Sequence, residues 1–219
     1  MRIKLERHET PFVSIIVPVY NAERTIGRLL QSLASLDYPR DRYEIVVVDN
    51  NSTDNSRTLV EARGLRCLKE QQAQSSYAAR NRGIEAARGE VIAFVDADCE
   101  VPAEWLARTV TAFGDRTVGC VACEIVGSPP TTPLEQYLLQ HRVLSPSRTL
   151  HHPFLPYAQT ACVLYRRDVF SRIGRFEPWV SSGDADLDWR MQRETPYRIH
   201  FEPSVSVTHH HRTTVWRYF

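Results

Sequence analysis

Strand-like and helix-like patterns of apolar positions alternate along the first half of the chain. Nearly continuous apolar runs predict buried strands at residues 12–20, 43–48 and 90–95, with further strands at 66–68 and 118–126. Apolar side chains recur at helical spacing from Ile26 to Leu33, and Asn21 is expected to cap that helix. Further helices are expected from about 53 to 62, over 77–87 with Gly89 closing it, and over 102–113.

This alternation is typical of an α/β protein with a mainly parallel sheet. From about residue 127 the pattern changes to loops rich in Pro and His. We expect a single domain over residues 1–219, in which about 12–126 and about 127–219 are two halves of one fold. Ligands of such sheets bind beyond the carboxyl ends of the strands, so polar residues that follow strands are the first candidates for a site.

Composition and charge exclude several classes of protein. The chain has 219 residues, of which 42% are hydrophobic and 24% charged, as in ordinary globular domains and unlike disordered or fibrous proteins. The 27 Lys and Arg residues nearly balance the 26 Asp and Glu residues, which argues against a nucleic-acid partner. No apolar run approaches the ~18 residues that suggest a membrane span.

The cysteines and the N-terminal residues indicate a cytoplasmic protein. Five cysteines are an odd number, and residues 1–6 contain no apolar stretch of a secretory signal. Cys120 and Cys123 form a C-x-x-C pair, but a structural zinc site needs a second pair, which the chain lacks. These two residues are therefore expected to be core thiols in the strand at 118–126.

Two acidic motifs follow predicted strands. Asp49 follows the strand at 43–48, and Asp96 and Asp98 follow the strand at 90–95. Two carboxylates separated by one residue at a strand end are suited to a hard cation such as Mg²⁺ or Mn²⁺, with a diphosphate completing the coordination. The chain contains neither G-x-G nor G-K-[ST], so a nucleotide would be held through carboxylates and a metal instead of a Gly-rich loop.

Five motifs, taken in order, resemble the pattern of family 2 inverting glycosyltransferases with the GT-A fold. They are Pro18-Val-Tyr-Asn21, Val48-Asp-Asn-Asn-Ser-Thr-Asp54, Ala79-Arg-Asn-Arg-Gly83, Phe94-Val-Asp-Ala-Asp98 and Gly183-Asp-Ala-Asp-Leu187. The resemblance extends from about residue 12 to about residue 212, and the order of the motifs makes it specific. It implies a Rossmann-like sheet flanked by helices, with a nucleotide-sugar-binding half at 12–126 and an acceptor-binding half at 127–219.

The resemblance also assigns roles to individual residues. Seven of them match positions at which the family binds the nucleotide: Pro18, Tyr20, Asn21, Asp49, Arg80, Asn81 and Asp96. Asp96 and Asp98 match the metal-binding D-x-D motif, with Asp98 the more direct ligand. His209 and His211 match a histidine region that reaches the diphosphate or the metal, and we expect His209 to be a metal ligand. As residues i and i+2 of a predicted strand, these two histidines would share one face.

Asp184 matches the catalytic base of the family. The resemblance therefore implies a direct displacement, in which Asp184 takes the proton of the acceptor hydroxyl and the anomeric configuration inverts. The Glu that often precedes this base is replaced here by Gly183, for which Asp186 is a partial substitute. From spacing alone, Asp186 and Asp188 are acids at the start of a helix, and Asp186 can pair with Arg190.

The remaining candidates concern the diphosphate and the acceptor. His211, Asp186 and Trp179 are candidate contacts to either group. The expected partners are a nucleotide-diphosphate sugar and a carbohydrate, lipid-linked or other hydroxyl acceptor, as in cell wall or polysaccharide biosynthesis. Uracil is the expected base, with guanine and thymine as alternatives. Peripheral association with the inner face of a membrane stays open, as does truncation of a chain that ends in Trp216-Arg-Tyr-Phe219.

Two other functions remain as alternatives. A sugar nucleotidyltransferase is disfavoured, because such enzymes begin with a Gly-rich loop after the first strand and residues 19–23 contain no glycine. A non-catalytic nucleotide-sugar-binding or scaffold domain with the same fold is kept open by Gly183. Donor hydrolysis in the presence of metal separates this alternative from the enzyme.

Overall fold

The computed structural model describes residues 10–177 and 181–211. Its strands are β1 (Val13–Val19), β2 (Tyr43–Asp49), β3 (Arg66–Lys69), β4 (Val91–Val95), β5 (Cys99–Glu100), β6 (Val118–Gly127), β7 (Cys162–Arg166) and β8 (Arg198–His209). Its helices are α1 (Ile26–Ala34), α2 (Ser56–Glu61), α3 (Ser76–Ala86), α4 (Trp105–Thr109), α5 (Pro133–Gln140), α6 (Pro146–Thr149), α7 (Arg167–Ile173) and α8 (Gly183–Glu194). Two short 3-10 helices are η1 (Arg40–Arg42) and η2 (Val110–Gly114).

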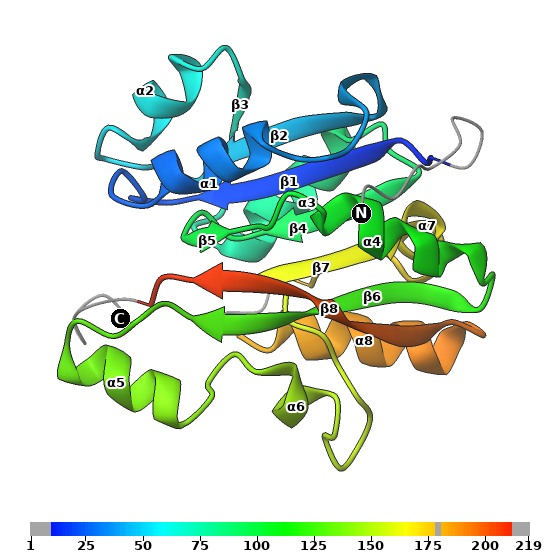
Figure 1. Ribbon diagram of the computed structural model, residues 1–219. Coiled ribbons are helices and arrows are strands. Elements are labelled where there is room, and N and C mark those ends of the chain that lie inside the picture. Colours follow the sequence, from blue (N-terminus) through cyan, green and yellow to red (C-terminus); the bar gives the residue numbers. More distant parts are fainter. Residues whose placement is uncertain (1–9, 178–180, 212–219) are drawn as a thin grey trace.

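The strands form one sheet in the order β3-β2-β1-β4-β7-β6-β8-β5 (Figure 1). From β3 to β4 all neighbours are parallel. β7 is antiparallel to both β4 and β6, while β8 is parallel to β6 and antiparallel to β5. The predicted α/β class is confirmed, with a parallel first part and a mixed second part. The pairing of β4 with β7 joins the two halves of the sequence in a continuous sheet.

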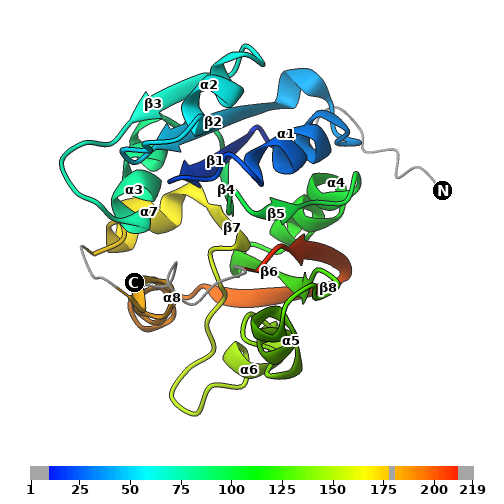
Figure 2. The ribbon, with the colours of Figure 1, turned by 90° about the vertical axis from the view of Figure 1, so that its left-hand side faces the viewer.

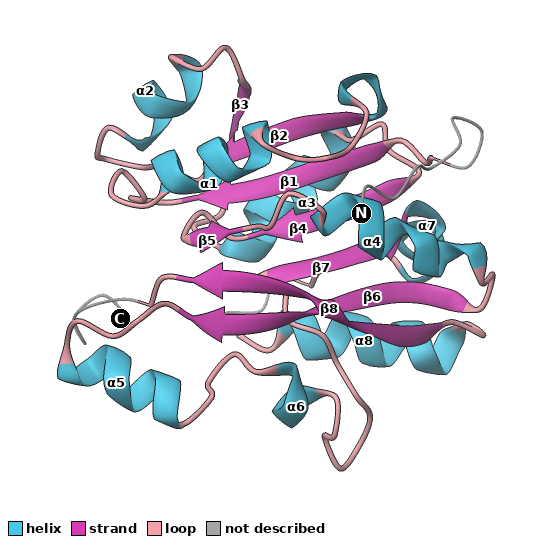
Figure 3. Cartoon of the chain, viewed as in Figure 1, coloured by secondary structure: helices cyan, strands magenta, loops and turns pink. Residues whose placement is uncertain are grey.

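Helices cover both faces of the sheet (Figures 2 and 3). α1 and α4 pack on one face, and α3, α7 and α8 lie on the other. Alternate residues of β1 therefore enter different cores: Ile15 belongs to the core that contains Trp105 of α4, whereas Ile16 belongs to the core that contains Leu187 of α8. A strand buried on both faces favours apolar residues at successive positions, which explains the nearly continuous apolar run at 13–19; its one polar side chain, Ser14, is buried with its hydroxyl hydrogen bonded.

Two sequence-based predictions about helix ends are wrong. Asn21 does not cap α1, because the helix begins at Ile26 after Thr25, and Asn21 lies in the preceding loop with a φ of 48°. Gly89 does not close α3, which already ends at Ala86. Gly89 is needed for close packing instead, since a Cβ there would lie 2.4 Å from the backbone nitrogen of Ser14.

The other helices differ from prediction mainly in length. The helix expected at 102–113 is divided into α4 and η2. The helix expected from residue 53 begins at Ser56, because Asp54 uses its carboxylate to accept hydrogen bonds from Ser56 and from the backbone nitrogen of Glu23. None of the helices within residues 10–177 and 181–211 combines the length and the apolar character needed to cross a bilayer.

The topology brings distant segments to one edge of the sheet. Val19 at the end of β1 lies beside Asp49 at the end of β2, and β4 ends next to them at Val95. The antiparallel β7 begins at this edge, since Val95 is paired with Cys162. The last residue of β8, His209, pairs with Cys99 and Gly127 at the same edge. The polar residues that follow or precede these strands are therefore neighbours in space.

Candidate active site

An ion pair between a buried arginine and a partly exposed aspartate lies just beyond the end of β4. The guanidinium of Arg80, from α3, is 2.6 Å from Oδ1 of Asp96, and Arg80 is only 4% exposed. Burial opposes the charge of this arginine, but the carboxylates of Asp96 and Asp184 outweigh it and raise the pKa of Arg80 above its ordinary value. Arg80 therefore links the D-x-D motif to the acidic start of α8 electrostatically.

Asp184, the candidate base, is oriented by one residue of the loop before β7. The backbone nitrogen of Thr160 donates to Oδ2 of Asp184 at 3.2 Å, and the Thr160 hydroxyl donates to Oδ1 at 3.0 Å. The next residue, Ala161, accepts a hydrogen bond from the backbone nitrogen of Asp96. Asp96 and Asp184 thus contact adjacent residues of one short segment, and the structure brings these two predicted site residues together.

The pKa of Asp184 is raised above the ordinary value of an aspartate. Its cause is burial, which Arg80 and the two hydrogen bonds from Thr160 partly offset. A raised pKa makes a carboxylate a stronger proton acceptor, provided that it remains ionised at the working pH. Sequence analysis missed Thr160, because a threonine before a strand is too common to carry a signal.

Removing the Thr160 hydroxyl is expected to shift the acidic limb of the pH–rate profile to higher pH. In Thr160→Val the backbone donor to Asp184 remains but the side-chain donor is lost. Because that donor favours the ionised form, the pKa of Asp184 rises, and activity that needs the carboxylate declines at a higher pH than in the wild type. A pH–rate profile of the variant measures this. A profile that superimposes on that of the wild type would show that the hydroxyl does not tune Asp184.

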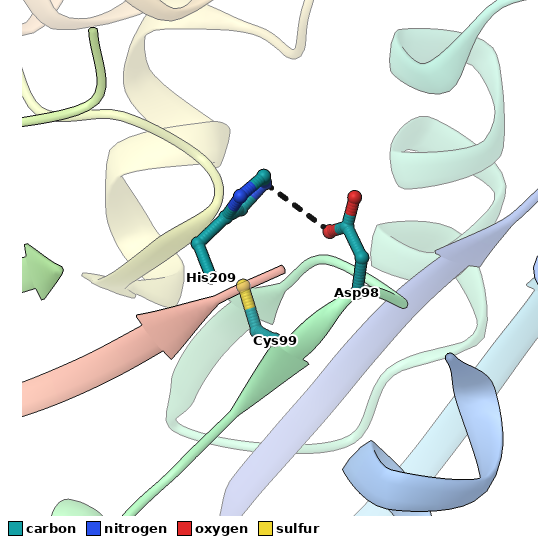
Figure 4. A group of neighbouring side chains, drawn as sticks. All are labelled: Asp98, Cys99 and His209. Atoms are coloured by element: carbon teal, nitrogen blue, oxygen red, sulfur yellow. Dashed lines mark ion pairs between the residues drawn. The ribbon is translucent and has the colours of Figure 1, made fainter. Parts of the chain in front are cut away.

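Asp98 and His209 face each other across the end of β5 (Figure 4). Oδ1 of Asp98 lies 3.3 Å from Nε2 of His209, although these residues are separated by more than a hundred positions in the sequence. The pairing of Cys99 with His209 in the β5–β8 ladder sets this approach. The D-x-D motif and the downstream histidine thus lie close together in the structure, as the sequence predicts.

The donor set fits a divalent cation of intermediate hardness. One ligand atom each from Asp98, Cys99 and His209 lies within 4.8 Å of the others. Burial and the nearby Asp98 and Asp96 charges raise the pKa of the Cys99 thiol well above its ordinary value, and its sulfur donates to the carbonyl oxygen of Ala161. A thiol must lose its proton to bind a metal, and a bound cation favours that loss. The carboxylate of Asp98 and the imidazole of His209 add an oxygen donor and a nitrogen donor, and both groups are common ligands of divalent metals.

The three consecutive histidines point to different neighbours. The rings of His209 and His211 are 4.8 Å apart, which confirms that they share a face. Burial, followed by the proximity of His209, lowers the pKa of His211, so this imidazole is neutral near pH 7. His210 lies apart from them, with Nε2 2.5 Å from Oε1 of Glu100, and its backbone nitrogen donates to the carbonyl oxygen of Asp98.

At the ends of β1 and β2, two loops are held together by polar side chains. The side-chain oxygen of Asn21 accepts a hydrogen bond from the backbone nitrogen of Thr53 at 2.8 Å, and Oδ1 of Asp49 accepts one from Ser52 at 3.3 Å. Asn21 adopts a left-handed backbone conformation, which asparagine tolerates better than most residues. Tyr20 is 55% exposed beside this pair of loops. Pro18, one residue before the end of β1, lies opposite Val48.

Two predicted site residues are engaged in contacts within the fold. The amide of Asn81 makes two hydrogen bonds with the backbone of Phe176: its nitrogen donates to the carbonyl oxygen at 2.8 Å, and its oxygen accepts from the backbone nitrogen at 3.1 Å. Asp186 forms the expected ion pair with Arg190 at 2.8 Å. Trp179 lies outside the described residues. The ligand contacts expected of these three residues stay predictions.

Asp188 is not a helix-terminal acid, as the sequence suggested, but a buried carboxylate. It is fully inaccessible and accepts hydrogen bonds from the backbone nitrogen of Ala158 at 2.6 Å and from the hydroxyl of Tyr165 at 2.9 Å. Burial raises its pKa to about 7, against the lowering effect of these two donors. Asp184 and Asp188, one helical turn apart, therefore hold neighbouring residues of the segment that precedes β7.

Comparison with known proteins gives consistent matches. Residues 14–174 match the model of glycosyl transferase family 2. Glycosyltransferase AglE of Haloferax volcanii is 32% identical over 91% of this chain and 67% of its own length. The pre-mycofactocin glycosyltransferase of Mycobacterium tuberculosis is 30% identical over 92% of this chain, which spans only 43% of that relative.

Solved structures agree in fold. A mannosyltransferase, PcManGT from Pyrobaculum calidifontis in complex with GDP-Man and Mn²⁺, superposes with a TM-score of 0.74 at 25% identity, covering 95% of this chain and 59% of the other. S. aureus TarS 1–349 in complex with UDP-GlcNAc gives a TM-score of 0.64 at 26% identity, covering 91% and 59%. The expected GT-A fold is confirmed by these likenesses. The family model and the relatives agree, and the chain therefore belongs to glycosyl transferase family 2.

Proposed function

We propose that this chain transfers a sugar from a nucleotide-diphosphate sugar to an acceptor hydroxyl, with inversion at the anomeric carbon and with help from a divalent cation. The observation that carries the proposal is the contact of Asp96 and Asp184 with the adjacent residues 160 and 161, together with the buried Arg80, whose charge interacts with both carboxylates. Such an arrangement supports the proposal of a proton acceptor close to a nucleotide–metal site. Family membership supports the same reaction class.

On the donor side, Tyr20, Asn21 and Asp49 would contact the base and the ribose. The exposed ring of Tyr20 offers a stacking surface, and the Asp49 carboxylate is an acceptor for the imino hydrogen of uracil. Uracil is our proposed base, and the complex of TarS with UDP-GlcNAc supports it. Guanine is the alternative, because PcManGT was solved with GDP-Man.

At the diphosphate, Asp98 and His209 would hold the cation, and Mn²⁺ suits their oxygen–nitrogen donor pair. When bound, the cation supplies Lewis-acid stabilisation of the charge that develops on the leaving diphosphate. Arg80 would hold the Asp96 carboxylate in a fixed direction, because its buried guanidinium lies 2.6 Å from Oδ1 of Asp96. His211, neutral and beside His209, would donate a hydrogen bond to a phosphate oxygen.

On the acceptor side, Asp184 would remove the proton from the attacking hydroxyl. The new bond forms between the acceptor oxygen and the anomeric carbon as the bond from that carbon to the diphosphate breaks, and the proton ends on Asp184. Thr160 keeps the carboxylate oriented throughout. One displacement without a covalent intermediate inverts the configuration. A lipid-linked acceptor would bring the chain to the inner face of a membrane.

Calorimetry with UDP in the presence and absence of Mn²⁺ tests the cation site. We expect Asp98→Asn to weaken Mn²⁺-dependent binding by at least the roughly 10–100-fold that removal of an outer-shell partner costs, because a direct ligand is lost. Binding without Mn²⁺ should change little. Asp41→Asn, at an exposed position of η1, is the matched control. Equal affinities of the wild type and Asp98→Asn with Mn²⁺ present would contradict the assignment of Asp98.

The same preparations separate an enzyme from a binding domain. UDP release from UDP-sugars in the presence of Mn²⁺, with or without acceptor, indicates a competent transferase. If the chain binds UDP and Mn²⁺ but releases no nucleoside diphosphate from any of a panel of UDP- and GDP-sugars, the non-catalytic alternative is favoured.

A further inference from the structure

The start of α8 is packed directly against a tyrosine from α3. A Cβ added to Gly183 would lie 2.7 Å from Cζ of Tyr77 and 2.9 Å from both of its Cε atoms. Real Cβ atoms do not approach that closely, so any side chain at 183 would displace the ring. Tyr77, 106 residues earlier in the chain, therefore occupies the space that a side chain at 183 would take. This contact explains why the residue before Asp184 is a glycine.

The hydroxyl of the same tyrosine anchors the first turn of α8. The residue before the helix, Ser182, has a left-handed φ of 66° and makes no side-chain capping hydrogen bond. The backbone nitrogen of Gly183 instead donates to the hydroxyl of Tyr77 at 3.0 Å. The first backbone nitrogens of a helix lack partners within it, and an external acceptor stabilises the helix start. Here that acceptor belongs to a different element, next to Asp184.

Tyr77 is itself held in place from two other sides. Its ring stacks on Phe176, with centroids 5.4 Å apart and an interplanar angle of 22°. The backbone of Phe176 is fixed by the two hydrogen bonds with Asn81. The guanidinium of Arg80 lies 5.5 Å from the ring centroid of Tyr77. The tyrosine thus contacts both the arginine that holds Asp96 and the glycine that precedes Asp184.

The charge environment keeps the tyrosine hydroxyl neutral. Burial, and then the negative charge of Asp184, raise the pKa of Tyr77 to about 12. A protonated hydroxyl that accepts from Gly183 still has its own hydrogen to donate on the side of the carboxylate.

We propose that Tyr77 is a positioning residue for Asp184: its ring and hydroxyl fix the first turn of α8 and thereby the direction of the base. The inference rests on the proposed function, because it assigns a role in proton removal. Tyr77 would act through α8 and Asp184 and not on the substrate itself. Its loss should impair turnover much more than donor binding, since the nucleotide and the cation contact other residues.

Tyr77→Phe tests the hydroxyl while keeping the ring against Gly183. We expect kcat to decrease about ten- to a hundredfold, the range in which small displacements of a reacting group act, while the affinity for UDP with Mn²⁺ changes less than about twofold. Tyr38→Phe is the matched control, because its buried hydroxyl also has a backbone partner, the carbonyl oxygen of Pro11, in a different part of the fold. A kcat of Tyr77→Phe equal to that of Tyr38→Phe overturns the inference.

A double-mutant cycle tests the contact between the ring and Gly183. Gly183→Ala alone should lower kcat strongly, because the new Cβ displaces the ring. In a Tyr77→Ala background the same substitution should have little further effect, since the space is then open. Fully additive effects of the two substitutions would show that the ring and Gly183 act independently and would overturn the inference. Thermal denaturation of each variant checks that it is folded at the assay temperature.

The failure of this inference is distinguishable from the failure of the proposed function. If Asp184→Asn retains its turnover, the base assignment fails whatever Tyr77 does. If Asp184→Asn is inactive and Tyr77→Phe matches its control, the proposed function stands and the role of Tyr77 is refuted.

Discussion

Asp184→Asn is expected to reduce kcat by about 10²–10⁴-fold, the usual contribution of a positioned general base. Asparagine has the same shape and offers an oxygen to the Thr160 hydroxyl, but it cannot take up the acceptor proton. UDP binding in the presence of Mn²⁺ should remain near the wild-type value, because the base and the cation ligands are separate residues. Steady-state transfer assays and calorimetry on the same preparation measure both quantities.

The control for this prediction lies on the same helix. Glu194→Gln changes an exposed carboxylate at the far end of α8 and should leave turnover close to that of the wild type. Turnover of Asp184→Asn within about twofold of this control would mean that another group accepts the proton. Loss of UDP binding in Asp184→Asn would instead indicate that the substitution disturbs the segment before β7, which Thr160 belongs to.

Replacement of Asp188 by Asn is expected to remove a large pH dependence of stability. The folded-state pKa of Asp188 is about 7, compared with an ordinary value of 3.8. Between these values the folded protein keeps a proton that the unfolded chain releases, so the free energy of unfolding falls as pH rises, by about 1.4 kcal/mol per pH unit at most. Asparagine does not titrate, yet its side-chain oxygen still accepts from Ala158 or Tyr165.

The stability of the wild type relative to Asp188→Asn should therefore be greatest near pH 4 and decline towards pH 7, with no further change above it. Chemical denaturation of both proteins between pH 4.5 and 8 measures the difference. Other titrating groups, such as Asp184, act in both proteins and largely cancel. Asp115→Asn is the control. Hydrogen bonds from Thr117 lower the pKa of that exposed carboxylate to about 2, so the stability difference between the wild type and Asp115→Asn should not change with pH over this range. If the free energies of unfolding of the wild type and Asp188→Asn change in parallel with pH, the raised pKa of Asp188 is refuted.

Sequence reasoning could select the candidate acids that the fold brings together, because strand ends and motif order are local signals. Asp96 and Asp98 directly follow a buried strand, and the ion pair of Asp186 with Arg190 follows from helical spacing alone. Asp188 was misjudged by the same reasoning, since one helix has both a solvent face and a core face. Which face a carboxylate occupies depends on the packing of α8 against β7, and spacing does not encode it.

The residues that contact the predicted acids could not be predicted from the sequence, for a related reason. Thr160 and Tyr77 have no distinctive neighbours in the sequence, and each acts through a contact with α8 that only the folded chain creates. Asn21 illustrates the converse error. Its residue type favours a helix cap, but its side-chain oxygen instead accepts a hydrogen bond from the backbone nitrogen of Thr53, in the loop after β2. Tertiary contacts overrode local preference at each of these positions.

The placement of β8 has a consequence for synthesis on the ribosome. Asp98 emerges more than a hundred residues before His209, the residue that faces it across the β5–β8 ladder. Until β7 emerges, the nascent chain exposes the open edge of the apolar β4, the kind of edge that invites pairing with other chains. The Asp98–His209 pair can form only when β7 and β8 are in place. On the proposed function, we therefore expect cation affinity to appear only after the β5–β8 ladder has formed.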